Sequence, residues 1–183
     1  MGKEYTVIDE RLQSWIERQK LFFVATAPLA ADGLVNCSPK GLDSLRVLGP
    51  TTLAYVDIGG SGIETVAHLK ENGRIVLMLC AFDGPPKIVR FYGTGKVVEP
   101  HDERFEALLG EFPPQPSVRN FIEIDVTRMI DSCGYGVPIY DFQKDRESLA
   151  NWYGNKSDEE VAEYRRSNNV ASLDGLPGLE KAD

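Results

Sequence analysis

About seven short strand-like runs, most of them joined by turns, limit the fold of this chain more than any other feature. Each run is apolar throughout or alternates apolar with polar residues, as strands do. The runs cover 21–27, 34–38, 45–48, 52–57, 75–82, 87–99 and 121–127. A parallel sheet would need a helix after nearly every strand, whereas most neighbouring strands here are joined by turns and the helix at 63–72 is a crossover between two of them. The pattern therefore predicts a mainly β fold with peripheral helices, built as an antiparallel barrel of six or seven strands.

Helices are expected around this barrel. Apolar residues at helical spacing predict helices at 9–19, 63–72 and 101–110. We expect Pro39 and Gly41 to interrupt the strand that begins at residue 34, because proline cannot donate to a strand ladder.

The composition changes after residue 143. One helical turn is expected near Trp152, and a capping box at Ser157 opens a polar helix that runs to about residue 168. The last ten residues are expected to fray. We therefore divide the chain into a barrel domain, 1–143, and a C-terminal helical extension, 144–183.

The charge of the chain argues against two classes of partner. The 183 residues carry a formal net charge of −8, whereas nucleic acids and anionic membranes attract basic surfaces. The longest apolar run, 75–82, is far shorter than the roughly 20 residues that span a bilayer. The N-terminus has no apolar signal core, and three widely spaced cysteines suggest no disulfide framework. We expect a cytoplasmic protein with free thiols and neither a nucleic-acid nor a membrane partner.

The metal-ligating residue types are few and poorly spaced. Cys37, Cys80, Cys133, His68 and His101 form no Cys-x-x-Cys or His-x-x-x-His pair, so no metal site is expected. Cys133 lies among small residues, which suits either a reactive thiol or a buried thiol in a tight turn. The turn is the simpler interpretation, because only two histidines could serve as a base.

Two segments are locally basic within this acidic chain. Between residues 33 and 56 the only acidic residue is Asp43, and between 84 and 98 there is none. Arg90 and Lys96 share one face of the strand at 87–99. These segments are either ordinary solvated cations on a sheet or parts of an anion site.

A glycine-rich loop, 59–62, opens the helix at 63–72. Backbone N–H groups of such a loop and of a helix N-terminus favour an anion, and Ser61 and Thr65 add hydroxyl groups. The alternative is a plain loop in which Ser61 caps the helix. An anion attached to a ring system would use this loop and both basic segments, and FMN fits that description.

Four blocks of sequence carry a resemblance to a known family. Asn36-Cys37-Ser38-Pro39-Lys40-Gly41 resembles its N-x-S-P-K-G stretch, and the blocks at 55–73, 90–97 and 132–138 resemble its later segments. The chain is identified, over about residues 10–150, as similar to the pyridoxamine 5′-phosphate oxidase-like FMN-binding split β-barrels. The resemblance implies a split barrel that forms a homodimer, with two FMN molecules at the interface.

The resemblance also implies which residues bind the cofactor. Ser38 and Lys40 would lie near the FMN phosphate or ring edge, and Asp57 would lie where a strand leads into the phosphate loop. Four further residues complete the expected set. They are Ser61, Gly62 and Thr65 at the phosphate, and Arg90, which would reach the cofactor of the partner chain.

The chain departs from true pyridoxamine phosphate oxidases at their substrate and phosphate motifs. Their phosphate loop carries a basic pair, whereas the loop here is Gly60-Ser61-Gly62, and their C-terminal Arg and His motif is not seen. We therefore expect an FMN-dependent oxidoreductase that acts on another small molecule, without a named catalytic side chain. The alternatives are a non-catalytic flavin or haem carrier, with His68 or His101 as the haem ligand, and a deazaflavin-dependent reductase.

Overall fold

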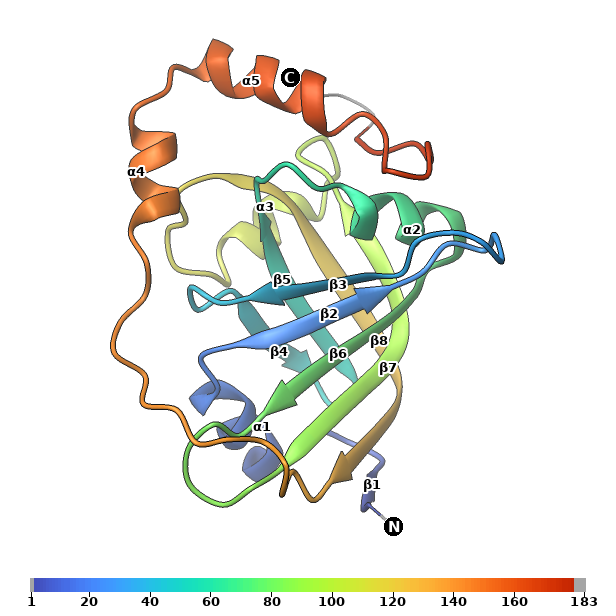
Figure 1. Cartoon of the computed structure of the whole chain (residues 1–183), viewed down its shortest axis with the longest axis vertical. Coiled ribbons are helices and arrows are strands. Elements are labelled where there is room, and N and C mark those ends of the chain that lie inside the picture. The colour runs from blue at the N-terminus through green and yellow to red at the C-terminus, as the bar shows by residue number, and fades with distance from the viewer. Residues whose placement is uncertain (1, 180–183) are drawn as a thin grey trace.

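The computed structural model describes residues 2–179 as one curled antiparallel sheet with helices around it (Figure 1). The strands are β1 Glu4–Tyr5, β2 Phe22–Thr26, β3 Asn36–Lys40, β4 Leu45–Gly49, β5 Thr52–Ile58, β6 Arg74–Cys80, β7 Ile88–Val98 and β8 Val118–Ser132. The helices are α1 Glu10–Arg18, α2 Glu64–Asn72, α3 Phe105–Leu109, α4 Ser148–Gly154 and α5 Asp158–Asn168. The strand order is β3-β2-β6-β7-β8-β5-β4, and β1 pairs with β8. The expected mainly β, antiparallel split barrel is confirmed, and the short β1 is an additional strand.

The sheet curls until its two ends approach each other. The ring of Phe22 on β2 lies edge-on to Tyr55 on β5, with ring centroids 5.6 Å apart. Three strands separate β2 from β5 along the sheet, so this contact crosses the interior. Lys40 on β3 reaches Asp57 on β5 across the same gap. Side chains rather than strand pairing therefore close the seam, which makes the barrel a split one.

Helix α1 covers one end of the barrel. Asp9 caps the helix by accepting a hydrogen bond from the N–H of Leu12 at 2.8 Å. Leu12, Trp15 and Ile16 are buried in the main core together with side chains of β2, β5, β6, β7 and β8. Each such side chain contributes about 1.5–3 kcal/mol through burial. Figure 1 shows α1 at one end and α2 at the other.

Two strand boundaries differ from the expectation. Strand β3 continues through Pro39 to Lys40, because β3 is an edge strand and a proline there can direct its missing N–H away from the sheet. Strand β8 spans Val118–Ser132 rather than 121–127. The polar residues at its two ends do not show a strand pattern in the sequence. Pairing with β5, β7 and β1 supplies backbone hydrogen-bond partners along the length of β8.

The helix expected at 101–110 is also shorter. Helix α3 spans only Phe105–Leu109. The Asp102 carboxylate accepts a hydrogen bond from the N–H of Glu99 at 2.7 Å. Side-chain bonds of this kind favour a turn over a helix, so the helix begins after Asp102.

The C-terminal segment lies over the end of the barrel where β5 leads into α2 (Figure 1). As expected, α5 has no buried residue. The expected fraying is wrong for residues 174–179, because Leu179 packs on Ile63 and Val66 and the N–H of Gly178 bonds the Val170 carbonyl at 2.8 Å. Residues 180–183, which complete that prediction, lie outside the described part. The domain boundary at 143 and 144 stays a prediction.

Within residues 2–179, no helix combines the length and the apolar character that crossing a membrane requires.

Candidate functional site

A buried carboxylate lies at the centre of a polar cluster beside the seam of the barrel. Asp57, near the end of β5, is 1% exposed. Its Oδ1 accepts a hydrogen bond from Lys40 Nζ at 2.9 Å. Its Oδ2 accepts two from Arg119, at 3.0 Å from Nε and 2.7 Å from Nη2, and one from Asn120 Nδ2 at 3.2 Å.

These partners set the ionisation of the carboxylate. Burial alone would raise the pKa of Asp57, but the adjacent Arg119 and Lys40 cations and their hydrogen bonds lower it well below its ordinary value. Asp57 is therefore ionised, and its oxygens are engaged by donors. A carboxylate held in this way positions its neighbours and is poorly suited to exchange protons.

Arg119 was missed by the sequence analysis and links the cluster to the glycine-rich loop. Its Nη1 donates to the carbonyls of Gly60 at 3.1 Å and Gly62 at 2.9 Å. Asn169, from the C-terminal segment, donates from Nδ2 to the Gly60 carbonyl at 2.9 Å. The only sequence signal for Arg119 is that a buried Asp57 requires a cation, and nothing in the spacing indicates which one.

The inward face of β3 extends the cluster towards α2. Asn36, Ser38 and Lys40 alternate with exposed Cys37 and Pro39, as a strand requires. Ser38 Oγ donates to Asn36 Oδ1 at 3.0 Å. Asn36 Nδ2 in turn donates to the hydroxyl of Thr65 at 3.0 Å. Ser38, Asn36 and Thr65 therefore form a second hydrogen-bonded group, on the strand that also carries Lys40.

The start of α2 has no side-chain cap. The capping position is Ile63, which makes no side-chain bond, so the alternative in which Ser61 caps the helix is wrong. Ser61 and Gly62 are both exposed. A Cβ on Gly62 would lie 2.7 Å from Glu64 Oε2, so a carboxylate occupies the space beside this glycine. An anion would be favoured at the free N–H groups of α2 but opposed on the Glu64 side.

Arg90 lies apart from the other six expected residues. Its Nη1 donates to Ser132 Oγ at 3.1 Å, near the far end of β8 from Arg119. Its side chain alternates with buried Val89 and Phe91 and so points to the outer face of the sheet. A single chain brings six of the seven residues to one region and leaves Arg90 outside it.

The histidines and cysteines do not add to this region. His68 is fully buried and its Nδ1 lies 2.9 Å from the Thr26 hydroxyl. Burial lowers the pKa of His68, which keeps the ring neutral near pH 7. Cys37 and Cys133 are exposed and Cys80 is buried, all as free thiols. In the described part of the chain, no three His, Cys, Asp or Glu residues form a group that could hold a metal.

Comparisons with known proteins agree with this architecture. The profile of the pyridoxamine 5′-phosphate oxidase family matches residues 8–133, more than half of the chain. The pyridoxamine 5′-phosphate oxidase family protein ustO of Aspergillus flavus is 39% identical over 197 residues, which cover 97% of this chain and 78% of ustO. The crystal structure of HupZ from Group A Streptococcus is similar with a TM-score of 0.53 at 21% identity, over 73% of this chain and 99% of HupZ. The likeness to HupZ supports the fold alone, whereas the first two matches show that the chain belongs to the pyridoxamine 5′-phosphate oxidase family.

Proposed function

We propose that this chain is an FMN-dependent oxidoreductase that acts on a small molecule as a homodimer. One observation carries the proposal: two cations share one buried carboxylate beside the free N-terminus of α2. The cluster therefore keeps a positive charge, which suits a phosphate group. When bound, FMN would supply hydride transfer through its ring system.

The residues of the cluster have separate roles in this proposal. The Lys40 side chain is 22% exposed, so its ammonium can donate to a bound phosphate or ring edge while Asp57 orients it. Ser38 and Thr65 add hydroxyl groups on the same side. Arg119 is a positioning residue, since its guanidinium holds both Asp57 and the loop carbonyls. Because Glu64 lies beside Gly62, we place the phosphate on the Lys40 side of the loop.

The homodimer is supported by apolar side chains that remain in water. Val35 is 74% exposed in the β2–β3 hairpin, and Tyr135 and Ile139 are 82% and 77% exposed after β8. Large exposed apolar groups are typical of protein interfaces. A second chain would also bring an Arg90 towards the cofactor of the first. Light scattering after gel filtration should give twice the chain mass, and a monomer at micromolar concentration would contradict this.

A cofactor titration tests the central proposal. We expect the purified protein to be yellow, or to take up added FMN with a change in the flavin spectrum. Lys40→Met should weaken FMN binding by about tenfold or more, because a charge-assisted hydrogen bond contributes about 1.5–3 kcal/mol. Lys96→Met, which removes an exposed lysine on β7, is the matched control and should leave binding unchanged. Colourless protein that takes up no FMN would refute the proposal.

A non-catalytic flavin carrier is the second candidate, and a specific observation favours it. Asp57 is held ionised by its partners, and burial raises the pKa of the neighbouring Tyr55 well above its ordinary value. Neither group is suited to proton transfer near neutral pH. Anaerobic reduction of bound FMN by NADH or NADPH would support the enzyme, and flavin that stays oxidised with both donors would support the carrier.

Two further alternatives can be tested with the same protein. A deazaflavin-dependent reductase would bind the deazaflavin in competition with FMN and more tightly. A haem carrier should show a Soret band that is lost on replacing its ligand, although His68 is enclosed by the core. We also propose a cytoplasmic location, because two exposed free thiols suit a reducing compartment.

A further inference from the structure

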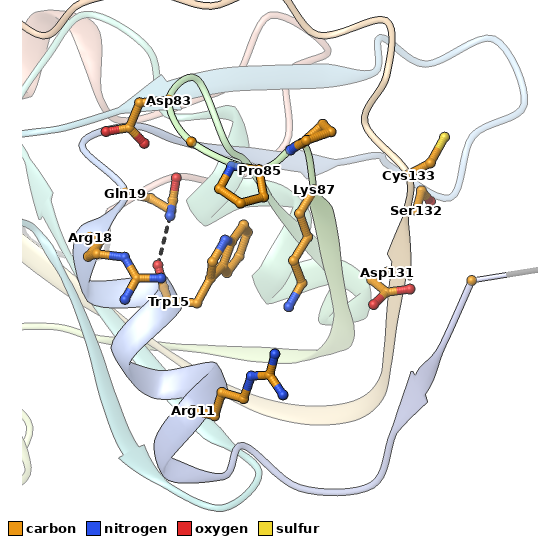
Figure 2. A pocket seen from close by; sticks show the side chains of 13 residues that line it. Arg11, Trp15, Arg18, Gln19, Asp83, Pro85, Lys87, Asp131, Ser132 and Cys133 are labelled. Atoms are coloured by element: carbon orange, nitrogen blue, oxygen red, sulfur yellow. Dashed lines mark hydrogen bonds between the residues drawn. The ribbon is translucent and has the colours of Figure 1, made fainter.

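A large cavity lies away from the Asp57 cluster, beside α1. It has a volume of about 930 Å³ and is bounded by α1, the turn between β6 and β7, and the end of β8 (Figure 2). Its lining includes the side chains of Arg11, Trp15, Arg18, Lys87, Asp131 and Cys133. Cavities of roughly 300–1,000 Å³ are the size that holds small organic ligands.

One face of α1 supplies an aromatic ring between two guanidinium groups. Arg11, Trp15 and Arg18 follow one another at spacings of four and three residues, which places them on one face of a helix. Leu12 and Ile16 are buried in the core on the neighbouring face. Figure 2 shows both arginines on the same helix as Trp15, which points towards Lys87 and Pro85.

The cations of this cavity are not matched by carboxylates. Among residues 2–179, the guanidinium groups of Arg11 and Arg18 make no hydrogen bond or ion pair. Lys87 Nζ lies 4.8 Å from the centroid of the Trp15 ring and 5.2 Å from that of Tyr5. Burial lowers the pKa of Lys87; Asp131 opposes this shift, whereas the neighbouring Arg11 lowers the pKa further.

The two carboxylates of the cavity do not neutralise its positive charge. Asp131 already accepts hydrogen bonds through both oxygens, from the N–H of Lys3 at 2.6 Å and from the Tyr5 hydroxyl at 2.7 Å. Asp83 is exposed on the turn between β6 and β7. Three cations therefore face two carboxylates, one of which is engaged elsewhere.

The walls of the cavity are held by backbone contacts. The N–H of Ala81 bonds the Lys87 carbonyl at 2.8 Å and closes the turn between β6 and β7. Gly134 adopts a φ of 68°, and a Cβ there would lie 2.8 Å from the backbone nitrogen of Lys87. This close approach requires glycine and places Cys133 at the rim. The cavity is therefore part of the folded barrel.

We propose that this cavity binds a small planar anion, a ring that carries a carboxylate or a phosphate. Arginine guanidinium groups match both anions in geometry, and Lys87 adds a further charge. The ring would lie beside Trp15, which is largely buried but lines the cavity. Within one chain the site is separate from the Asp57 cluster, since Ser132 lines the cavity at one end of β8 and Arg119 lies near the other end. It therefore does not depend on the proposed function.

Trp15 allows binding to be measured directly. The chain contains two tryptophans, so a Trp152→Phe background leaves the fluorescence of Trp15 alone. We expect phenyl phosphate or benzoate to change this fluorescence in a saturable way, and inorganic phosphate and phenol each to bind at least about tenfold more weakly. The tighter of the two ring-bearing probes identifies the anion. No saturable change with either probe at millimolar concentration would overturn the proposal.

Charge variants and thiol protection place the probe in the cavity. Arg11→Gln combined with Arg18→Gln should weaken binding about tenfold or more. Arg166→Gln, which removes an equally charged exposed side chain on α5, should have less than about a twofold effect. The bound probe should slow alkylation of Cys133 and leave the exposed Cys37 unchanged. If the Arg11 and Arg18 variant and the Arg166 variant weaken probe binding equally, while both unfold like the unchanged protein, the proposed site is wrong.

A competition experiment separates this site from the flavin site. Saturating FMN should leave the affinity for the probe unchanged. Displacement of the probe by FMN would show that the cavity is the flavin site and would overturn the inference. The probe titration also stands if the protein takes up no FMN, so failure of the proposed function is distinguishable from failure of this inference.

Discussion

Two groups of charged side chains lie towards opposite ends of β8, and they differ in how their charges are compensated. At the Arg119 end, Asp57 accepts four hydrogen bonds and is almost fully buried. At the Ser132 end, Arg11 and Arg18 line an open cavity without a carboxylate partner. Buried charge must be paired to be tolerated, whereas solvated charge can remain free for a ligand. The first group therefore stabilises the barrel and orients Lys40, and the second is suited to bind a molecule from solution.

The largest expected effect comes from removing the guanidinium at the buried end. Arg119→Met leaves Asp57 buried with one cation fewer and frees the Gly60 and Gly62 carbonyls, so it should lower the free energy of unfolding by about 3–5 kcal/mol. Urea unfolding monitored by circular dichroism measures this. Arg104→Met is the control, because the Arg104–Glu123 pair is half-exposed and should contribute at most about 1 kcal/mol. Equal losses would show that the Asp57 cluster has no special structural role.

Acid unfolding tests the same cluster by a second route. The pKa of Asp57 is lowered in the folded chain, so its contribution to stability is present above the unfolded pKa of about 4 and is lost as the pH falls below that value. Asp57→Asn should flatten the dependence of stability on pH in this acidic range. Asp32→Asn, on an exposed turn, should leave the dependence as it is. An unchanged slope in Asp57→Asn would contradict the strong pairing.

A smaller effect on stability is expected from Lys40. Its side chain is partly in water, so Lys40→Met should lower the free energy of unfolding by about 1 kcal/mol, well below the loss in Arg119→Met. The same variant should show a large loss of FMN affinity. A stability loss as large as that of Arg119→Met would assign Lys40 to the structural part of the cluster.

At the cavity end, Tyr5 should produce a pH dependence on the alkaline side. Burial and the hydrogen bond to Asp131 raise the pKa of Tyr5 to about 12. The raised pKa adds stability that is present below pH 10 and is lost as the pH rises towards about 12. A titration of tyrosinate absorption should show a late phase, to which the buried Tyr55 and Tyr153 also contribute, and Tyr5→Phe should lower its amplitude by one tyrosine. Tyr135→Phe, at an 82% exposed site, should leave this late phase in place.

The smallest expected effect is at Ser61, which lies in the glycine-rich loop but does not cap α2. Ser61→Ala should change the free energy of unfolding by less than about 0.5 kcal/mol. Ser157→Ala should cost about 1 kcal/mol, because Ser157 forms a complete capping box at the start of α5. Comparable losses in the two variants would restore the capping role to Ser61.

Local features of this fold could be predicted from the sequence, whereas long-range features could not. The helices expected at 9–19 and 63–72 depend on the spacing of neighbouring residues, and the structure shows α1 and α2 there. The effect of Pro39 on β3 depends on whether the strand lies at an edge of the sheet, which the local sequence does not reveal. The long β8 was underestimated for the same reason, since its polar ends are stabilised by strands far away in the chain.

The candidate flavin site also contains residues that local motifs predict and a residue that they do not. Lys40 and Asp57 were selected from separate motifs and meet at 2.9 Å, whereas Arg119 is 62 residues from Asp57 and belongs to no motif. The cavity was missed because Arg11 and Arg18 resemble ordinary solvated residues of an amphipathic helix. Only the turn between β6 and β7 and the end of β8, both distant in sequence, make them walls of a cavity.

The order of apolar runs and turns was enough to determine a mainly β antiparallel barrel with peripheral helices, because strand and helix periodicity are local properties of the chain. The pairing of charges was decided by the tertiary structure. The curl of the sheet brings β3, β5 and the start of β8 together and buries Asp57 among its hydrogen-bond donors. At the other end of β8, the cavity beside α1 is lined by arginines that have no carboxylate partner. Whether a charge is compensated depends on distances through space, which the sequence does not contain.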